Sequence, residues 1–179
     1  LELCRDIAQK FNNDFQEENF LQVPEPLIQK EFSRIMSLKD GSKKMSKSEL
    51  SDLSRINLTD NKDQIINKIK KAKTDPLPMP QDRKELDNRL EAKNLLEIYS
   101  SLTNSSIQDS VQTFAGKNFS EFKERLAEEI INKINPISEE IKKLLSDKNY
   151  LDEILLDGVE KANLIASKKI ERIKEIVGF

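Results

Sequence analysis

The sequence predicts a mainly α-helical protein, in which a short strand and a polar loop precede a helical bundle. Apolar residues recur every three or four positions along most of the chain, which is the spacing of helices with one buried face. One short apolar segment, residues 32–38, is instead followed by a turn and a loop rich in lysine and serine. Three prolines within residues 74–83 then mark a boundary that a helix interior cannot cross.

Three elements are expected ahead of the loop: an amphipathic helix, an extended connection broken by Pro24 and Pro26, and a buried strand. The pattern predicts them over residues 1–18, 19–31 and 32–38. After the loop, a second helix is predicted from residue 61 to residue 73, with Asp60 as its N-cap.

Residues 84–179 are predicted to form an all-α bundle with short connections. Gly116 is expected to end one helix, Pro136 to start another at its first position, and Gly158 to separate the last two. The predicted helices cover residues 86–102, 107–114, 122–134, 136–145, 150–155 and 159–177. We expect the apolar stripes of these helices to form the core.

Composition limits the chemistry that the chain can perform. Of its 179 residues 35% are charged and the net charge is −2, so contact with nucleic acid would depend on local basic patches. Histidine is absent and Cys4 is the single cysteine, which excludes histidine-based triads, zinc sites and internal disulfides and is typical of a reducing compartment. No apolar run reaches the ~18–20 residues of a membrane span. The chain opens within an amphipathic pattern and without methionine, so we expect a piece of a longer protein.

Residues 41–48, GSKKMSKS, hold three lysines and three serines behind a glycine that permits a tight entry turn. A solvated connector is the ordinary interpretation of such a composition. The order KMSKS favours phosphate binding instead, because Lys44 and Lys47 are spaced to converge on one polyphosphate and the serine hydroxyls can donate to it. Met45 supplies an apolar anchor that can pack against an adenine face. The glycine spacing of a P-loop is missing.

A second basic group lies at the end of the helix predicted over residues 61–73. The helical pattern places it on the face opposite the apolar residues, and it consists of Lys68, Lys70, Lys71 and Lys73. Cations near a helix C-terminus interact favourably with the helix dipole, so a solvated face is enough to explain them. Phosphate contact is the alternative that stays open.

Several segments resemble, in order and spacing, the bacterial and mitochondrial type of the tryptophanyl-tRNA synthetase family, which belongs to class I of the aminoacyl-tRNA synthetases. They are LELCRDIAQKFN at 1–12, VPEP at 23–26, RIMSL at 34–38, KKMSKS at 43–48, KTD at 73–75, EAKNLLEIY at 91–99 and DGVEKA at 157–162. KMSKS alone occurs in all class I synthetases. The ordered set, with Ile35 nine residues ahead of Lys44, resembles the tryptophan family more than the sister tyrosine family.

The resemblance implies a two-step reaction, in which tryptophan and MgATP form tryptophanyl-adenylate and pyrophosphate and the acyl group then passes to the 3′ end of tRNA(Trp). It implies that Lys44 and Lys47 are catalytic, because their charges would stabilise the leaving pyrophosphate. The ATP-binding residues that it implies are Ile35, whose backbone would meet the adenine, Lys44, Met45, Ser46, Lys47 and Ser48. The candidate tRNA contacts are Lys68, Lys70, Lys71 and Lys73.

The resemblance also implies three parts. Residues 1–73 correspond to the end of a Rossmann-type catalytic domain with the KMSKS loop, residues 74–83 to a proline-rich linker, and residues 84–179 to the helical domain that binds the anticodon. A cytoplasmic ligase of protein biosynthesis is implied, homodimeric as the full-length protein, with Mg²⁺ bound together with ATP and no metal site in this chain.

Some features depart from the family. The HIGH signature, whose residues grip ATP, and the GxDQ segment, which carries the acid that recognises indole, are absent from the 179 residues. Leu90 and Glu49 replace the usual proline and aspartate. The alternatives are therefore a helical tRNA-binding module without catalysis and a helical interaction protein whose KMSKS arose by chance.

Overall fold

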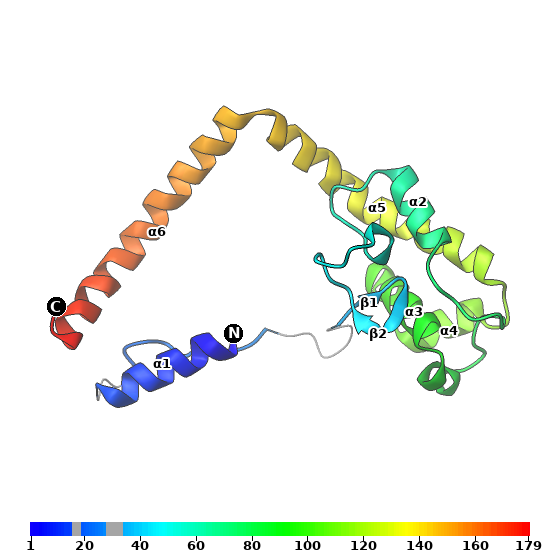
Figure 1. Ribbon diagram of the computed structural model, residues 1–179, viewed down its shortest axis with the longest axis horizontal. Coiled ribbons are helices and arrows are strands. Elements are labelled where there is room, and N and C mark those ends of the chain that lie inside the picture. Colours follow the sequence, from blue (N-terminus) through cyan, green and yellow to red (C-terminus); the bar gives the residue numbers. More distant parts are fainter. Residues whose placement is uncertain (16–18, 28–33) are drawn as a thin grey trace. The chain divides into compact units, whose positions relative to one another are not determined.

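The computed structural model describes residues 1–15, 19–27 and 34–179 (Figure 1). It is mainly helical and contains one short two-stranded sheet, which confirms the predicted fold class. The chain divides into two compact units, of which one is Lys30–Ser146 and the other combines Leu1–Gln29 with Asp147–Phe179. Within the described ranges, none of the helices has the length and apolar character that crossing a bilayer requires.

The sheet consists of β1 (Met36–Ser37) and β2 (Asp40–Lys44), which pair antiparallel with an irregularity inside β1. The strand predicted over residues 32–38 is confirmed at residues 36 and 37, while residues 32 and 33 lie outside the described part. The prediction of a loop from residue 41 onward is wrong for its first four residues. They extend as β2, because pairing with β1 gives their backbone hydrogen-bond partners.

Helix α2 (Lys62–Lys70) follows a single 3₁₀ turn, η1 (Asp52–Ser54). The sequence predicts Asp60 as the N-cap, but in the structure the N-cap is Asn61. Asn61 Oδ1 accepts the backbone N–H of Gln64 at 2.9 Å, and Gln64 Oε1 accepts the N–H of Asn61 at 2.8 Å. This capping box satisfies two backbone donors, and Asp60 turns its carboxylate to a buried partner instead.

Three further helices complete this unit: α3 (Leu90–Thr103), α4 (Ile107–Phe114) and α5 (Phe119–Ser146). A 3₁₀ segment, η2 (Arg83–Asn88), precedes α3, so the helix predicted over residues 86–102 starts later than expected. Helix α2 lies along α5, while α3 contacts α4, α5 and β2 (Figure 1). The core side chains include Leu38, Ile65, Ile69, Leu95, Leu96, Val111, Phe122 and Leu126.

Two predicted helix boundaries are wrong. Pro136 lies inside α5, and Gly158 lies inside α6 (Lys148–Val177). A proline in a helix interior costs about 3 kcal/mol, but Leu126 and Ile130 anchor α5 in the core, and the helix continues through Pro136 to Ser146. A single glycine costs about 1 kcal/mol relative to alanine, which is too little to end a long helix.

The other unit contains α1 (Glu2–Asp14) and α6. Parts of the predictions here, residues 16–18 of the first helix and 28–31 of the connection, lie outside the described residues. Lys169 of α6 donates to the backbone oxygen of Phe20 at 2.7 Å, with its ammonium 4.1 Å from the centre of the Phe20 ring. All of α6 is described and none of its residues is buried. The expectation that its apolar stripe forms core is therefore wrong, since residues such as Leu155, Val159 and Ile165 are exposed.

Residues 74–83 lack α-helix, as their prolines predict, but the structure does not divide the chain there. Met79 is buried, its N–H donates to Lys117 O at 2.9 Å, and its carbonyl accepts the N–H of Gly116 at 3.1 Å. These contacts place the segment within the unit Lys30–Ser146, together with residues on both sides of it.

Gly41 allows β2 to approach the start of α3. A Cβ at this position would lie 2.8 Å from the backbone nitrogen of Glu91 and 2.8 Å from the carbonyl carbon of Leu90. Nonbonded atoms do not come so close, so this position requires a residue without a side chain. Gly41 serves close packing against a helix in addition to any role in the turn.

The variant Gly41→Ala should lower the free energy of unfolding by about 1–3 kcal/mol, because β2 or α3 must shift to accept the methyl group. Gly158→Ala is the matched control, since a Cβ there meets nothing within 4 Å. It should raise stability by about 0.5–1 kcal/mol through helix propensity. Urea unfolding followed by circular dichroism measures both variants. Unchanged stability of Gly41→Ala would show that the two backbones lie further apart.

Candidate functional site

The predicted site residues gather at the end of β2. Lys44 is the last residue of this strand, and residues 45–49, the KMSKS turn, follow it. In this turn the N–H of Glu49 donates to Ser46 O at 3.4 Å, and the N–H of Ser48 donates to Ser46 Oγ at 3.3 Å. The hydroxyls of Ser46 and Ser48 lie 2.9 Å apart. The two serines therefore close the turn on itself.

Lys44 and Lys47, the two predicted catalytic residues, each bring a positive charge to this region. Both are exposed, and within the described part of the chain neither ammonium group forms an ion pair. The neighbouring Lys43 differs, because its ammonium lies 3.5 Å from the carboxylate of Asp40. The structure thus leaves Lys44 and Lys47 available to an anionic ligand.

The structure joins Ile35 directly to the turn. The N–H of Met45 donates to Ile35 O at 3.0 Å, and Met36 pairs with Lys44 across the sheet. Met45 itself is half-buried and packs against the hydrophobic core. The predicted adenine contact and the predicted phosphate contacts therefore lie together at one end of the sheet.

Helix α3 fixes the position of the sheet. The buried side chain of Asn94 donates from Nδ2 to Met36 O at 2.9 Å and accepts the N–H of Met36 on Oδ1 at 2.8 Å. Glu91, in the first turn of α3, forms an ion pair with Lys73 at 2.8 Å and accepts a hydrogen bond from the backbone of Gly41. Both strands are thus hydrogen-bonded to one helix.

The Glu91–Lys73 pair is charged on both sides. The hydrogen bond from Lys73 lowers the pKa of Glu91 more than any other contact does, and Glu91 raises the pKa of Lys73 through the same bond. Lys73, which the sequence offers as a tRNA contact, therefore already has a carboxylate partner, although its side chain stays largely exposed.

Lys68 is buried, so its predicted place on the solvent-facing side of α2 is wrong. Its side chain is 3% exposed, and Nζ lies 2.6 Å from Asp60 Oδ2 and 2.7 Å from Asp52 Oδ2. The two carboxylates compensate an ammonium that has lost its water. The hydrogen bond from Lys68, followed by one from Asn57, lowers the pKa of Asp52. Lys68 has no surface to offer a phosphate.

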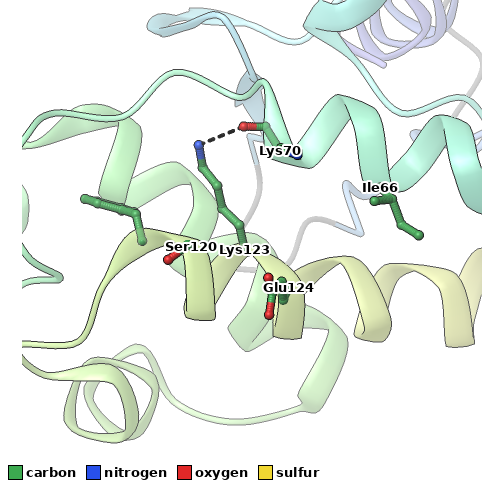
Figure 2. Close-up of a pocket in the computed structure, with 6 residues that line it drawn as sticks. Ile66, Lys70, Ser120, Lys123 and Glu124 are labelled. Atoms are coloured by element: carbon green, nitrogen blue, oxygen red, sulfur yellow. Dashed lines mark hydrogen bonds between the residues drawn. The ribbon is translucent and has the colours of Figure 1, made fainter.

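Lys70 and Lys71 are exposed at the C-terminal end of α2. Lys70 borders a pocket of about 300 Å³ between α2 and α5 (Figure 2). The pocket is lined by Ile66, Lys70, Phe119, Ser120, Lys123 and Glu124. Lys123 Nζ donates to Ala72 O at 2.6 Å and to Lys70 O at 3.3 Å, and burial lowers the pKa of this lysine. Lys123 thereby satisfies carbonyls at the end of α2, and no residue of the KMSKS turn lines the pocket.

Sequence reasoning missed Asn94, Glu91 and Asp52. Asn94 offers a signal, because it lies beside Leu95 and Leu96 in a run of buried helical positions, where a polar residue needs a partner. Lys68 offers another, since it follows Ile65 by three residues and so shares the apolar face. Glu91 offers none, because its partner Lys73 is distant in the chain, and the same holds for the contact of Asp52 with Lys68.

Comparison with known proteins places the chain in a family. The family model described as tRNA synthetases class I (W and Y) matches residues 1–135. A tryptophan–tRNA ligase from Caulobacter vibrioides is 49% identical over 179 residues, which are 100% of this chain and 52% of that protein. The ligase from Rickettsia felis is 50% identical over 179 residues, 100% of this chain and 53% of that protein. The chain spans about half the length of the curated relatives that it matches.

Solved structures agree with this result. Tryptophanyl-tRNA synthetase from Mycoplasma pneumoniae matches with a TM-score of 0.84 at 25% identity, over 99% of this chain and 52% of that chain. The Campylobacter jejuni enzyme complexed with ADP and tryptophan matches with a TM-score of 0.67 at 26% identity, over 99% and 53%. Because the family model covers most of its residues, the chain belongs to the class I tRNA synthetases of the tryptophan and tyrosine group.

Proposed function

We propose that this chain supplies the KMSKS part of the ATP site and the tRNA-binding helices of a tryptophan–tRNA ligase. One observation carries the proposal: Lys44 and Lys47 are exposed and have no ion-pair partner among the described residues, at the end of a sheet that also presents Ile35. An adenine contact beside two free ammonium groups matches the shape and charge of a nucleoside polyphosphate. The tryptophan–tRNA ligases among the relatives support tryptophan as the amino acid.

In this proposal ATP lies with its adenine at Ile35 and its phosphates at Lys44 and Lys47. When the carboxylate of tryptophan forms the adenylate, pyrophosphate leaves and negative charge grows on it. The two ammonium groups stabilise that charge electrostatically, without transferring a proton. Ser46 and Ser48 exchange their mutual hydrogen bond for bonds to phosphate oxygens, and Met45 keeps the turn anchored to the core.

In the second step the aminoacyl group passes to the 3′ end of tRNA(Trp). We assign residues 1–73 to the end of the catalytic domain, residues 84–179 to the anticodon-binding helices, and residues 74–83 to the connection between them. The exposed Lys70 and Lys71 support contact with RNA phosphates. The complete ligase is proposed to be a cytoplasmic homodimer.

Mg²⁺ is proposed to enter this site together with ATP. Magnesium is usually held by one or two carboxylates and the substrate phosphates. Among the residues that the structure describes, no cluster of three acidic or cysteine side chains could hold a metal ion. We assign ligands of the ion to the phosphates of the nucleotide and derive no step of the reaction through it.

A second candidate function is a tRNA-binding helical module without catalysis. It differs from the first in one testable respect, because it expects no chemistry from these 179 residues alone. Tryptophan-dependent exchange of pyrophosphate into ATP by this chain alone would refute the function of a module without catalysis. Exchange that needs the complete ligase agrees with both functions and assigns catalysis to the complete protein.

The variant Lys47→Ala, in the complete ligase that contains this chain, should lower kcat of ATP–pyrophosphate exchange by about 10²-fold, because one stabilising charge on the leaving group is lost. The KM for tryptophan should stay within about twofold, since Lys47 does not contact the amino acid. Exchange of labelled pyrophosphate into ATP measures both constants.

Lys142→Ala is the matched control for this variant, because Lys142 pairs with Glu139 on the exposed surface of α5 and lies outside the KMSKS turn. Its exchange kinetics should equal those of the unmodified ligase. A Lys47→Ala variant with raised KM for tryptophan and unchanged kcat would contradict the assigned role.

The double variant Lys70→Ala/Lys71→Ala should weaken the binding of tRNA(Trp) and reduce the slope of log K against log salt concentration by about 1 per lysine, as expected when phosphate contacts are lost. Lys62→Ala, at the opposite end of the same helix, is the control and should leave the slope unchanged. Fluorescence anisotropy at several salt concentrations gives the slopes. Equal slopes for all three proteins would remove Lys70 and Lys71 from the RNA surface.

A further inference from the structure

The two ends of the KMSKS turn are held in different ways. At its start, the turn continues β2 and Met45 is hydrogen-bonded to Ile35. At its end, residues 49–51 belong to no helix or strand, and the chain reaches the 3₁₀ turn η1 only at Asp52. Side-chain contacts at residues 49–51 therefore help to set the position of Lys47 relative to Lys44 and Ile35.

Arg55 makes the contacts that fix this end. Its Nη1 donates to the backbone oxygen of Glu49, the residue that directly follows KMSKS, at 2.9 Å. Its Nη2 lies 3.1 Å from Asp52 Oδ1, and its Nε donates to Asn57 Oδ1 at 3.1 Å. The side chain is only 18% exposed, and Nη1 also donates to Ser51 O at 3.5 Å, so these contacts leave the planar guanidinium one orientation.

Asp52 connects this guanidinium to the buried part of the unit. One oxygen of its carboxylate faces Arg55, and the other lies 2.7 Å from the ammonium of the buried Lys68. Lys68 is held in turn by Asp60 at 2.6 Å. A continuous series of charge-assisted contacts thus runs from α2 to the carbonyl of Glu49.

Helix α2 is a rigid base for this series. Ile65 and Ile69 of α2 are fully buried, and the helix packs along α5. The backbone links the same regions, because Leu38 N–H donates to Ser54 O at 2.9 Å and Lys73 N–H donates to Leu38 O at 2.8 Å. The contacts of Arg55 therefore connect the exposed KMSKS turn to helix α2, which is packed in the core.

We propose that Arg55, oriented through Asp52 by the buried Lys68, is a positioning residue that sets the place of Lys47 in the ATP site. The proposal rests on the function proposed above and assigns no contact with ATP to Arg55, Asp52 or Lys68. The ammonium of Lys47 is preorganised for the phosphates of ATP only if the turn holds its position. Arg55 therefore contributes to the rate only while Lys47 is present.

The test is a double-mutant cycle in the complete ligase. Arg55→Gln should lower kcat of ATP–pyrophosphate exchange by about tenfold, the effect of a small misplacement, with the KM for tryptophan unchanged. In the Lys47→Ala background the same substitution should cost less than about twofold, because there is no ammonium left to misplace. Arg55→Lys keeps the positive charge but loses the planar guanidinium, whose several N–H groups reach different partners, and should behave like Arg55→Gln.

Arg125→Gln is the matched control, since Arg125 forms its ion pairs with Glu128 and Glu129 within α5. The conservative variant Arg55→Lys takes the place of Arg55→Gln in the cycle if the glutamine variant fails to fold. A full loss from Arg55→Gln in the Lys47→Ala background, or wild-type kinetics for Arg55→Lys, would overturn the positioning role. An unmodified ligase without exchange would instead overturn the proposed function.

Discussion

The buried ammonium of Lys68 is the interaction on which the organisation of the site depends. Removing such a charge from water costs several kcal/mol, and the cost is offset only while both Asp60 and Asp52 stay within hydrogen-bond distance. Asp60 immediately precedes the cap of α2, whereas Asp52 lies in the turn that follows KMSKS. The buried cation, together with Asn57, whose side-chain amide donates to both carboxylates, therefore holds the two segments at a fixed separation. Neither carboxylate can move away without leaving a buried charge unpaired.

Helix α3 constrains the same site from the other side. Asn94 fixes β1 through both backbone groups of Met36, and Glu91 binds Gly41 of β2 at the point where the two backbones nearly touch. A boundary at the prolines of residues 74–83 would separate α3 from the strands. The packing instead holds α3 against the strands, so α3 and the turn proposed to bind ATP share one support within the unit Lys30–Ser146.

Sequence periodicity predicted the helices well where local rules and packing agree, as for α4, whose bounds match the prediction. It failed at Pro136 and Gly158, because a local penalty of a few kcal/mol is outweighed by the burial or propensity of a long helix around it. The order of residues predicts a site at Ile35 and KMSKS, which stays a prediction, and the sheet brings these residues together. The prediction for Lys68 was wrong because a lysine-rich helix end is typical of a solvent-facing surface. The carboxylates of Asp52 and Asp60, which stabilise the buried lysine, are brought to it by the fold.

The lysines of this unit fall into two kinds, and the difference decides which of them can act on a ligand. Lys68 and Lys73 already face carboxylates, so their fields are largely neutralised and a phosphate would have to compete with a partner already in place. Lys44 and Lys47 have no such partner among the described residues, and their charges stay available for an anion. Free charge alone is not sufficient for catalysis, since an ammonium on a loose turn loses orientation entropy when it binds. The paired lysines, aspartates and Asn94 therefore have a role that complements the free lysines: they hold fixed the backbone from which the two free charges project.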